Sequence, residues 1–262
     1  MRWPRRPERV DNGGVNNATL FASVAREYAN FRPGYPPALF EWLARSCVRN
    51  EVAWDCGCGS GQASVALAAH FQRVFATDVS AEQIAAAKPQ DRVVYTVRPA
   101  EHSGLPDASI DLVTVAQALH WFDVQAFYRE VRRVVRPGAV LAIWTYPRPE
   151  FVDAALDRGF EDFYASVVGP FWPPERRHVD AGYRTLAFPF DELPHPDFGL
   201  DLQWTLPQVL GYVSSWSAVA RYKKEKGTDP VPFLESALAP AWPRAAQATL
   251  RMPLVLRVAR TG

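Results

Sequence analysis

Between residues 50 and 146, short apolar runs alternate with segments whose apolar positions follow a helical repeat. The apolar runs have the length of buried strands and lie at 73–77, 93–97, 110–116 and 139–145. Of the segments between them, 123–136 places Phe127, Val131 and Val134 on one helical face. Strands that alternate with helices are typical of a parallel sheet joined by crossover helices. The pattern therefore predicts an α/β fold.

This alternation stops after Pro149. Residues 150–198 are rich in Phe, Trp, Tyr and Pro and show no strand repeat, which predicts an inserted cap of helices and loops. Four further elements are expected: a sixth strand over 199–205, helices over 207–222 and 232–239, and a last strand over 249–259. Near the start, Pro36 and Pro37 suit the first turn of a helix over 37–48, and we expect residues 1–20 to be a disordered tail.

Composition and charge limit the partners and the compartment. The chain has 262 residues, enough for one large α/β domain with a cap. Its net charge is +1 with both signs interleaved, so no strong field favours nucleic acid or an anionic membrane. No apolar stretch approaches 18 residues, and the three cysteines suit a reducing compartment. We therefore expect a soluble, cytoplasmic protein with no nucleic-acid or membrane partner.

A glycine-rich loop follows the first apolar run, Val52–Trp54. It reads Asp55-Cys56-Gly57-Cys58-Gly59-Ser60-Gly61 and precedes a helical pattern from Gln62. The dinucleotide fingerprint needs its third glycine one residue later, and no Lys follows as in a P-loop. Asp55 would repel a pyrophosphate but suits an ammonium group, as in S-adenosylmethionine. The Cys-x-Cys pair has no further ligand at metal-site spacing, so we expect no metal there.

Several polar residues follow strand ends and should meet in one crevice, because ligands of open α/β sheets bind beyond the carboxyl ends of the strands. Asp78 stands 21 positions after Gly57, where an acid can bind both ribose hydroxyls. Ser80, with Gln83 three residues later, has the spacing of a helix N-cap. Ala100-Glu101 follows the third strand, where an adenine would lie, and Gln117–Phe122 follows the fourth.

On these residues the chain resembles the class I S-adenosylmethionine-dependent methyltransferases, within the small-molecule branch that contains trans-aconitate methyltransferase-like proteins. The runs that carry the resemblance are Tyr28–Pro36, Asp55–Gly61, Asp78–Ser80, Ala100–Glu101, Leu105–Asp107, Gln117–Phe122 and Leu206–Tyr222. It implies a Rossmann-like, mostly parallel seven-stranded sheet with helices on both faces, an antiparallel last strand and a helical, aromatic cap. It also implies one domain over 21–262, divided into 21–48 over the cofactor, the binding core 50–146, the cap 147–198 and the final strands and helices 199–262.

The resemblance also implies roles for residues around the cofactor, S-adenosyl-L-methionine. Tyr28 and Arg32 come from the covering segment, and Arg32 is expected to hold the methionine carboxylate. Asp55 should accept from the ammonium, directly or through water, and Gln117 offers a backbone carbonyl nearby. The remaining expected contacts are Gly57, Gly59 and Gly61 on methionine and ribose, Asp78 and Val79 at the ribose, and Ala100 and Glu101 at the adenine.

The methyl acceptor should lie beside His120, the candidate catalytic residue. His120 can abstract a proton, and it can equally form only a wall of the pocket. The expected acceptor-binding residues are Tyr35, His120, Trp121, Trp172, Tyr183 and Trp216. Phe171, Tyr212 and Tyr222 would add to this aromatic box, which suggests an organic small molecule. Arg176, Arg177 and Arg184 could pair an acidic group, but we favour the interpretation of Arg176-Arg177 as a solvated charge run.

The sequence thus predicts an S-adenosylmethionine-dependent methyltransferase acting on oxygen or nitrogen of an organic small molecule, such as a carboxylate or a secondary metabolite. Proximity and desolvation would drive in-line transfer. We expect the methyl acceptor to be its only ligand partner besides the cofactor. We expect the protein itself to be a monomer or a weak homodimer. A non-catalytic protein that binds S-adenosylmethionine or adenosylhomocysteine on the same fold is the alternative.

Overall fold

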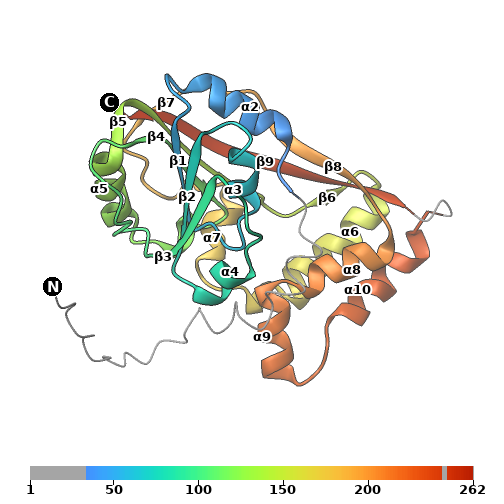
Figure 1. Ribbon diagram of the computed structural model, residues 1–262. Helices are drawn as coiled ribbons and strands as arrows, with labels where there is room; N and C mark the ends of the chain where they lie inside the picture. The colour runs from blue at the N-terminus through green and yellow to red at the C-terminus, as the bar shows by residue number, and fades with distance from the viewer. Residues whose placement is uncertain (1–33, 244–246, 262) are drawn as a thin grey trace, which may run out of the picture.

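The computed structural model describes residues 34–243 and 247–261 (Figure 1). The expected tail and the candidate cofactor contacts Tyr28 and Arg32 lie outside these residues. Within the described ranges, no helix has both the length and the apolar character needed to cross a bilayer.

The predicted parallel sheet forms the centre of the molecule. Its parallel strands are β1 (Val52–Cys56), β2 (Arg73–Asp78), β3 (Val93–Val97), β4 (Ile110–Ala116) and β5 (Val135–Thr145). They lie in the order β3-β2-β1-β4-β5, and each neighbouring pair is parallel. The order reverses direction beside β1 and β4, so the loops after these strands open onto the crevice of a doubly wound sheet.

A long strand, β9 (Ala248–Thr261), extends this sheet in the antiparallel sense. The strands that pair with it are β5, β6 (Glu150–Phe151), β7 (Asp191–Glu192) and β8 (Phe198–Trp204). The described residues therefore form nine strands, not the expected seven. The additional pair, β6 and β7, are two residues long each, too short to leave a repeat in the sequence. The mixed, Rossmann-like α/β architecture is as predicted.

Helices cover both faces of the core sheet. Those of the core are α2 (Pro37–Ser46), α3 (Gln62–Leu67), α4 (Ala81–Ala86) and α5 (Val124–Val134). One face packs on Leu39, Leu43 and Leu67 of α2 and α3, and the other on α5 through Phe127 and Val131. Helix α5 ends before the expected position 136, because Val135 already pairs with Ile110 at the start of β5.

The cap is a separate group of helices at one side of the sheet (Figure 1). Its helices are α6 (Ala154–Asp162), α8 (Leu206–Ser214), α9 (Ser217–Lys226) and α10 (Val231–Leu238). Short helical turns complete it at Phe163–Val167, Gly169–Phe171 and Ala239–Ala241. The short helix α7 (Arg176–Asp180) lies beside the core sheet, where Val179 packs among residues of β4 and α5 (Figure 1). The single helix expected over 207–222 is wrong: it breaks at Ser215-Trp216, where the Trp216 side chain turns into the cap core beside Phe160. Thr205 caps α8 with a reciprocal Thr205–Gln208 capping box.

Candidate functional site

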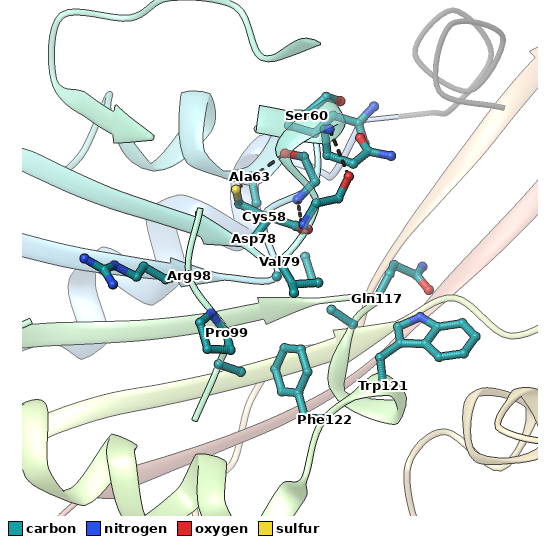
Figure 2. Close-up of a pocket in the computed structure, with 18 of the residues that line it drawn as sticks. Cys58, Ser60, Ala63, Asp78, Val79, Arg98, Pro99, Gln117, Trp121 and Phe122 are labelled. Atoms are coloured by element: carbon teal, nitrogen blue, oxygen red, sulfur yellow. Dashed lines mark hydrogen bonds between the residues drawn. The ribbon is translucent and has the colours of Figure 1, made fainter. Parts of the chain in front are cut away.

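A cavity of about 320 Å³ opens at the carboxyl ends of β1, β2, β3 and β4 (Figure 2). Its volume is within the range of small-molecule pockets. Nine residues that the sequence predicts as contacts line it: Tyr35, Gly57, Gly59, Asp78, Val79, Ala100, Glu101, Gln117 and Trp121. The structure therefore brings together in one crevice residues from five segments of the chain.

The glycine loop is tied to the end of the neighbouring strand β2. The backbone N–H groups of Gly57 and Cys58 both donate to the carbonyl of Thr77, at 2.8 and 3.0 Å. The Gly59 N–H donates to Asp78 Oδ2 at 2.8 Å. These three donors are thus used within the protein, which suits a ligand without phosphates better than an anion cradle.

Gly57 shows why this loop needs glycine. Its φ is +68°, a left-handed conformation, and a Cβ there would lie 2.6 Å from Ala118 Cβ. Ala118 leaves β4 directly after Gln117, so the two loops that line the cavity touch at this point. A side chain at position 57 would push them apart.

Asp78 holds the loop and the start of the next helix with one carboxylate (Figure 2). Its Oδ2 accepts from Gly59 and its Oδ1 accepts from the Ser80 N–H at 2.9 Å. Ser80 is the N-cap of α4, as predicted, since its side chain accepts from the Gln83 N–H. Asp78 also lines the cavity, and each carboxylate oxygen keeps further lone pairs for a ligand hydroxyl.

Asp55 lies beneath the cavity and does not line it. Its expected interaction with a cofactor ammonium, directly or through water, stays a prediction. Its side chain is fully buried, and its oxygens accept from Ser64 Oγ at 2.5 Å and Thr114 Oγ1 at 2.9 Å. Burial raises its pKa to about 6, against the opposing effect of these two hydrogen bonds. Asp55 therefore joins β1, α3 and β4 under the loop.

Gly61 also lies outside the cavity lining. It is the left-handed N-cap of α3, with φ +88°, and a Cβ there would lie 2.3 Å from the Tyr95 hydroxyl oxygen. The close packing of the loop against Tyr95 of β3 therefore explains why glycine stands at position 61. The expected contact of Gly61 with the cofactor stays a prediction.

Gln117 has an unusual backbone at the end of β4. Its φ is +62°, a conformation that costs energy for a residue with a side chain. Two contacts fix it: its N–H donates to the Trp144 carbonyl, and its Oε1 accepts from Thr145 Oγ1, both at 2.9 Å. The strained residue lies in the cavity wall, where it turns the chain sharply toward Trp121.

Glu101, a predicted lining residue, accepts from the Asp123 N–H at 2.9 Å and so joins the loop after β3 to the start of α5.

Sequence reasoning missed several other lining residues. The missed residues include Gln83, Arg98 and Pro99. Each directly follows a strand end or starts the helix after it, so the same topological rule that selected Asp78 could have selected them.

His120 lies beside the cavity in the turn Leu119–Trp121. Its Nδ1 is 2.9 Å from the hydroxyl oxygen of Tyr183, which is almost fully buried. Its ring centroid is 4.6 Å from that of Trp121, which lines the cavity. Burial raises the pKa of Tyr183, opposed by its hydrogen bond to Thr145 and by the nearby charge of Arg176. His120 and Tyr183 thus connect the cavity to the cap.

Trp172 and Trp216 lie in the cap and not in the cavity lining. Their ring centroids are 5.4 Å apart, and Tyr164 and Tyr212 stand 5.7 and 5.6 Å from Trp216. Arg176 joins this cluster, with its guanidinium 4.6 Å from the centre of the Trp172 ring. The interpretation of Arg176 as part of a solvated charge run is therefore wrong, whereas Arg177 is exposed.

We expect Gly57→Ala to destabilise the fold by about 1–3 kcal/mol and to weaken ligand binding in the cavity, because the new methyl group overlaps Ala118. Gly59→Ala is the matched control, since its φ is +55° but a Cβ there has no neighbour nearer than 3.8 Å. Chemical denaturation and calorimetry of both variants measure the difference. Equal losses would attribute the whole effect to backbone strain.

Known proteins resemble most of this chain. A family described as a methyltransferase domain matches residues 54–143. A protein of Dictyostelium discoideum that carries a methyltransferase name is 34% identical over 226 residues, 85% of this chain and 86% of that protein. An uncharacterized methyltransferase of Mycobacterium tuberculosis is 37% identical over 72% of this chain and 73% of its own length. The solved structure of a type II methyltransferase from Anaeromyxobacter dehalogenans is 44% identical, covers 88% of this chain and 98% of its own, and has a TM-score of 0.82.

Proposed function

Because the chain belongs to the class I S-adenosylmethionine-dependent methyltransferases, we propose that it methylates an oxygen or nitrogen atom of an organic small molecule. The hydrogen bond between His120 and Tyr183 carries this proposal. It holds the imidazole at the edge of a cavity of cofactor size, beside Tyr183, which lies near Arg176 of the cap's aromatic cluster. A small organic molecule bound by the cap would therefore lie close to the cofactor.

The cavity fits S-adenosylmethionine. Gly57 keeps a space that a Cβ would fill, and Asp78 has lone pairs to accept from the two ribose hydroxyls. Ala100 and Phe122 offer apolar surface for the adenine, with Glu101 beside them. Gln117 would turn its backbone carbonyl toward the ammonium group, with Asp55 supporting the loop from below.

S-adenosylmethionine supplies a methyl group already activated by its sulfonium. What this chain's residues contribute is placement, exclusion of water and a proton acceptor. Trp121 and Tyr35 form an aromatic wall of the cavity, and Tyr35 is itself held by stacking on Tyr146 at 5.7 Å. The hydrogen bond between His120 Nδ1 and Tyr183 orients the imidazole beside the cavity, where it would take the proton of a hydroxyl or amine acceptor.

We also place the chain in the branch of small-molecule enzymes that resembles trans-aconitate methyltransferases. The Phe31–Pro36 and His120–Phe122 runs support this placement. The cap supports it as well, because its buried aromatic residues suit a compact organic acceptor better than a macromolecule.

Two measurements test the proposal. Adenosylhomocysteine at about a hundred times its Kd should stabilise the fold by ~2.7 kcal/mol, measured by thermal unfolding. A screen of organic hydroxyl, amine and acid acceptors with a labelled methyl donor should then yield labelled product. Transfer of label to protein or nucleic acid, with none to any small molecule, would contradict the acceptor class.

A further inference from the structure

Arg176 is the cation of the cap's aromatic cluster. Its side chain is 20% exposed, and the guanidinium lies 4.6 Å from the centre of the Trp172 ring and 5.8 Å from that of Tyr164. Its neighbour Arg177 points out to solvent. The guanidinium is thus largely covered by aromatic rings while part of its fork of five N–H donors stays accessible.

Only one nitrogen of this guanidinium is used. Arg176 Nε lies 3.0 Å from the Tyr164 hydroxyl and 3.0 Å from Asp180 Oδ1, and Tyr164 donates to the same Asp180 oxygen at 2.8 Å. Among the described residues, the two terminal nitrogens of Arg176 have no hydrogen-bond partner. Asp180 therefore balances the charge of the Arg176 guanidinium, and the N–H groups of its two terminal nitrogens remain available to a ligand.

A second donor beside Arg176 is also unpaired. The indole Nε1 of Trp172 is buried and has no hydrogen-bond partner among the described residues. A buried donor left unpaired costs about 1–3 kcal/mol, so native proteins seldom leave one without a reason. This buried indole N–H lies beside the open guanidinium fork of Arg176, and the pair points to an acceptor that arrives from outside the chain.

We propose that Arg176 and Trp172 form an anchor for a carboxylate of the methyl acceptor. This inference rests on the proposed function and names the chemical class of its substrate. The planar fork of a guanidinium matches the two oxygens of a carboxylate, and the indole N–H adds a third donor. The rings of Trp172, Trp216 and Tyr212 would surround the apolar body of the molecule.

The anchored carboxylate is not the group that is methylated. A carboxylate engaged by a guanidinium and an indole N–H has its lone pairs withdrawn, so it is a poor nucleophile. Arg176 is close enough to Tyr183 to lower that hydroxyl's pKa against the larger effect of burial, and Tyr183 binds His120. The acceptor would thus be held at its acid by Arg176 and present a hydroxyl or amine to His120.

Calorimetry on the full chain saturated with adenosylhomocysteine tests this anchor. The probes are butanoate, hexanoate and phenylacetate, each compared with its primary amide and its phosphate-ester counterpart. The wild type should bind the acids about tenfold or more tightly than the amides. Arg176→Gln should abolish this preference and Trp172→Phe should reduce it about threefold or more, whereas the adjacent Arg177→Gln should retain it.

Each outcome decides the proposal. If the wild type binds no acid, or binds acids and amides equally, or if Arg176→Gln keeps the preference, the anchor is refuted. Tighter binding of the phosphate esters would overturn the carboxylate in favour of a phosphoryl group. If Arg176→Gln does not fold, Trp172→Phe decides, because it keeps an aromatic ring at this position and removes the indole N–H. Adenosylhomocysteine binding, measured separately, shows whether the proposed function itself fails.

Discussion

Replacing His120 with alanine is expected to lower turnover about 10²–10⁴-fold, with affinity for adenosylhomocysteine nearly unchanged. The imidazole stands beside the cavity wall at Trp121 and is oriented by Tyr183, yet it lies outside the lining of the cofactor cavity. Steady-state kinetics and calorimetry on the same preparations measure the two effects.

The pH profile identifies the role of His120 more sharply than the rate alone. A proton acceptor must be neutral, so the wild-type rate should rise with pH through one ionisation that the variant lacks. His120→Asn keeps polarity and bulk but cannot titrate near neutral pH. Near-full turnover in His120→Asn would exclude the base and reduce His120 to a wall of the acceptor site, in which case the Michaelis constant would change most.

We expect Asp78→Ala to weaken adenosylhomocysteine binding about 10²–10⁴-fold. Two hydrogen bonds from ribose hydroxyls to a charged carboxylate are lost, each worth about 1.5–3 kcal/mol in the folded protein. The variant also loses the acceptor of the Gly59 and Ser80 N–H groups, so its melting temperature should fall. Calorimetry and thermal unfolding separate binding from stability.

Glu82→Ala is the control for Asp78. Glu82 is also acidic and stands at the start of the same helix, but it is exposed and lies outside the cavity lining. Its loss should leave the affinity for adenosylhomocysteine unchanged. Asp78→Asn keeps the shape of the side chain without its charge and should bind the ligand more weakly than the wild type but more tightly than alanine. An affinity unchanged in Asp78→Ala would assign Asp78 to loop support alone.

The cofactor half of the site could be predicted because its signals are local. A strand, a turn and a helix start are encoded within about ten residues around Gly57, and the topological rule then gathers Asp78, Glu101 and Gln117 at one edge of the sheet. Each of these residues follows its own strand directly. Their meeting place therefore depends only on strand order.

The parts that sequence reasoning missed depend on contacts across the fold. Asp55 precedes the glycines, but Thr114, 59 positions away, supplies the hydroxyl that keeps it below the loop. Arg176 looks solvated beside Arg177, but the rings of Trp172 and Tyr164 cover its guanidinium. The short strand β7 forms only because β9 offers it an edge. None of these partners is marked in the nearby sequence.

The position of β9 in the sheet has a consequence for how the protein is made. Strand β9 pairs with β5 in the core and with β8 beside the cap, and Thr261 binds the Ala139 carbonyl across 122 positions. All the other strands and the cap helices are synthesised before β9 leaves the ribosome. Until then the apolar edge of β5 has no partner, and an unpaired edge of this kind readily joins other chains. Nascent chains should therefore be prone to aggregate and depend on chaperones, and closure over such long loops should be the slow step of folding.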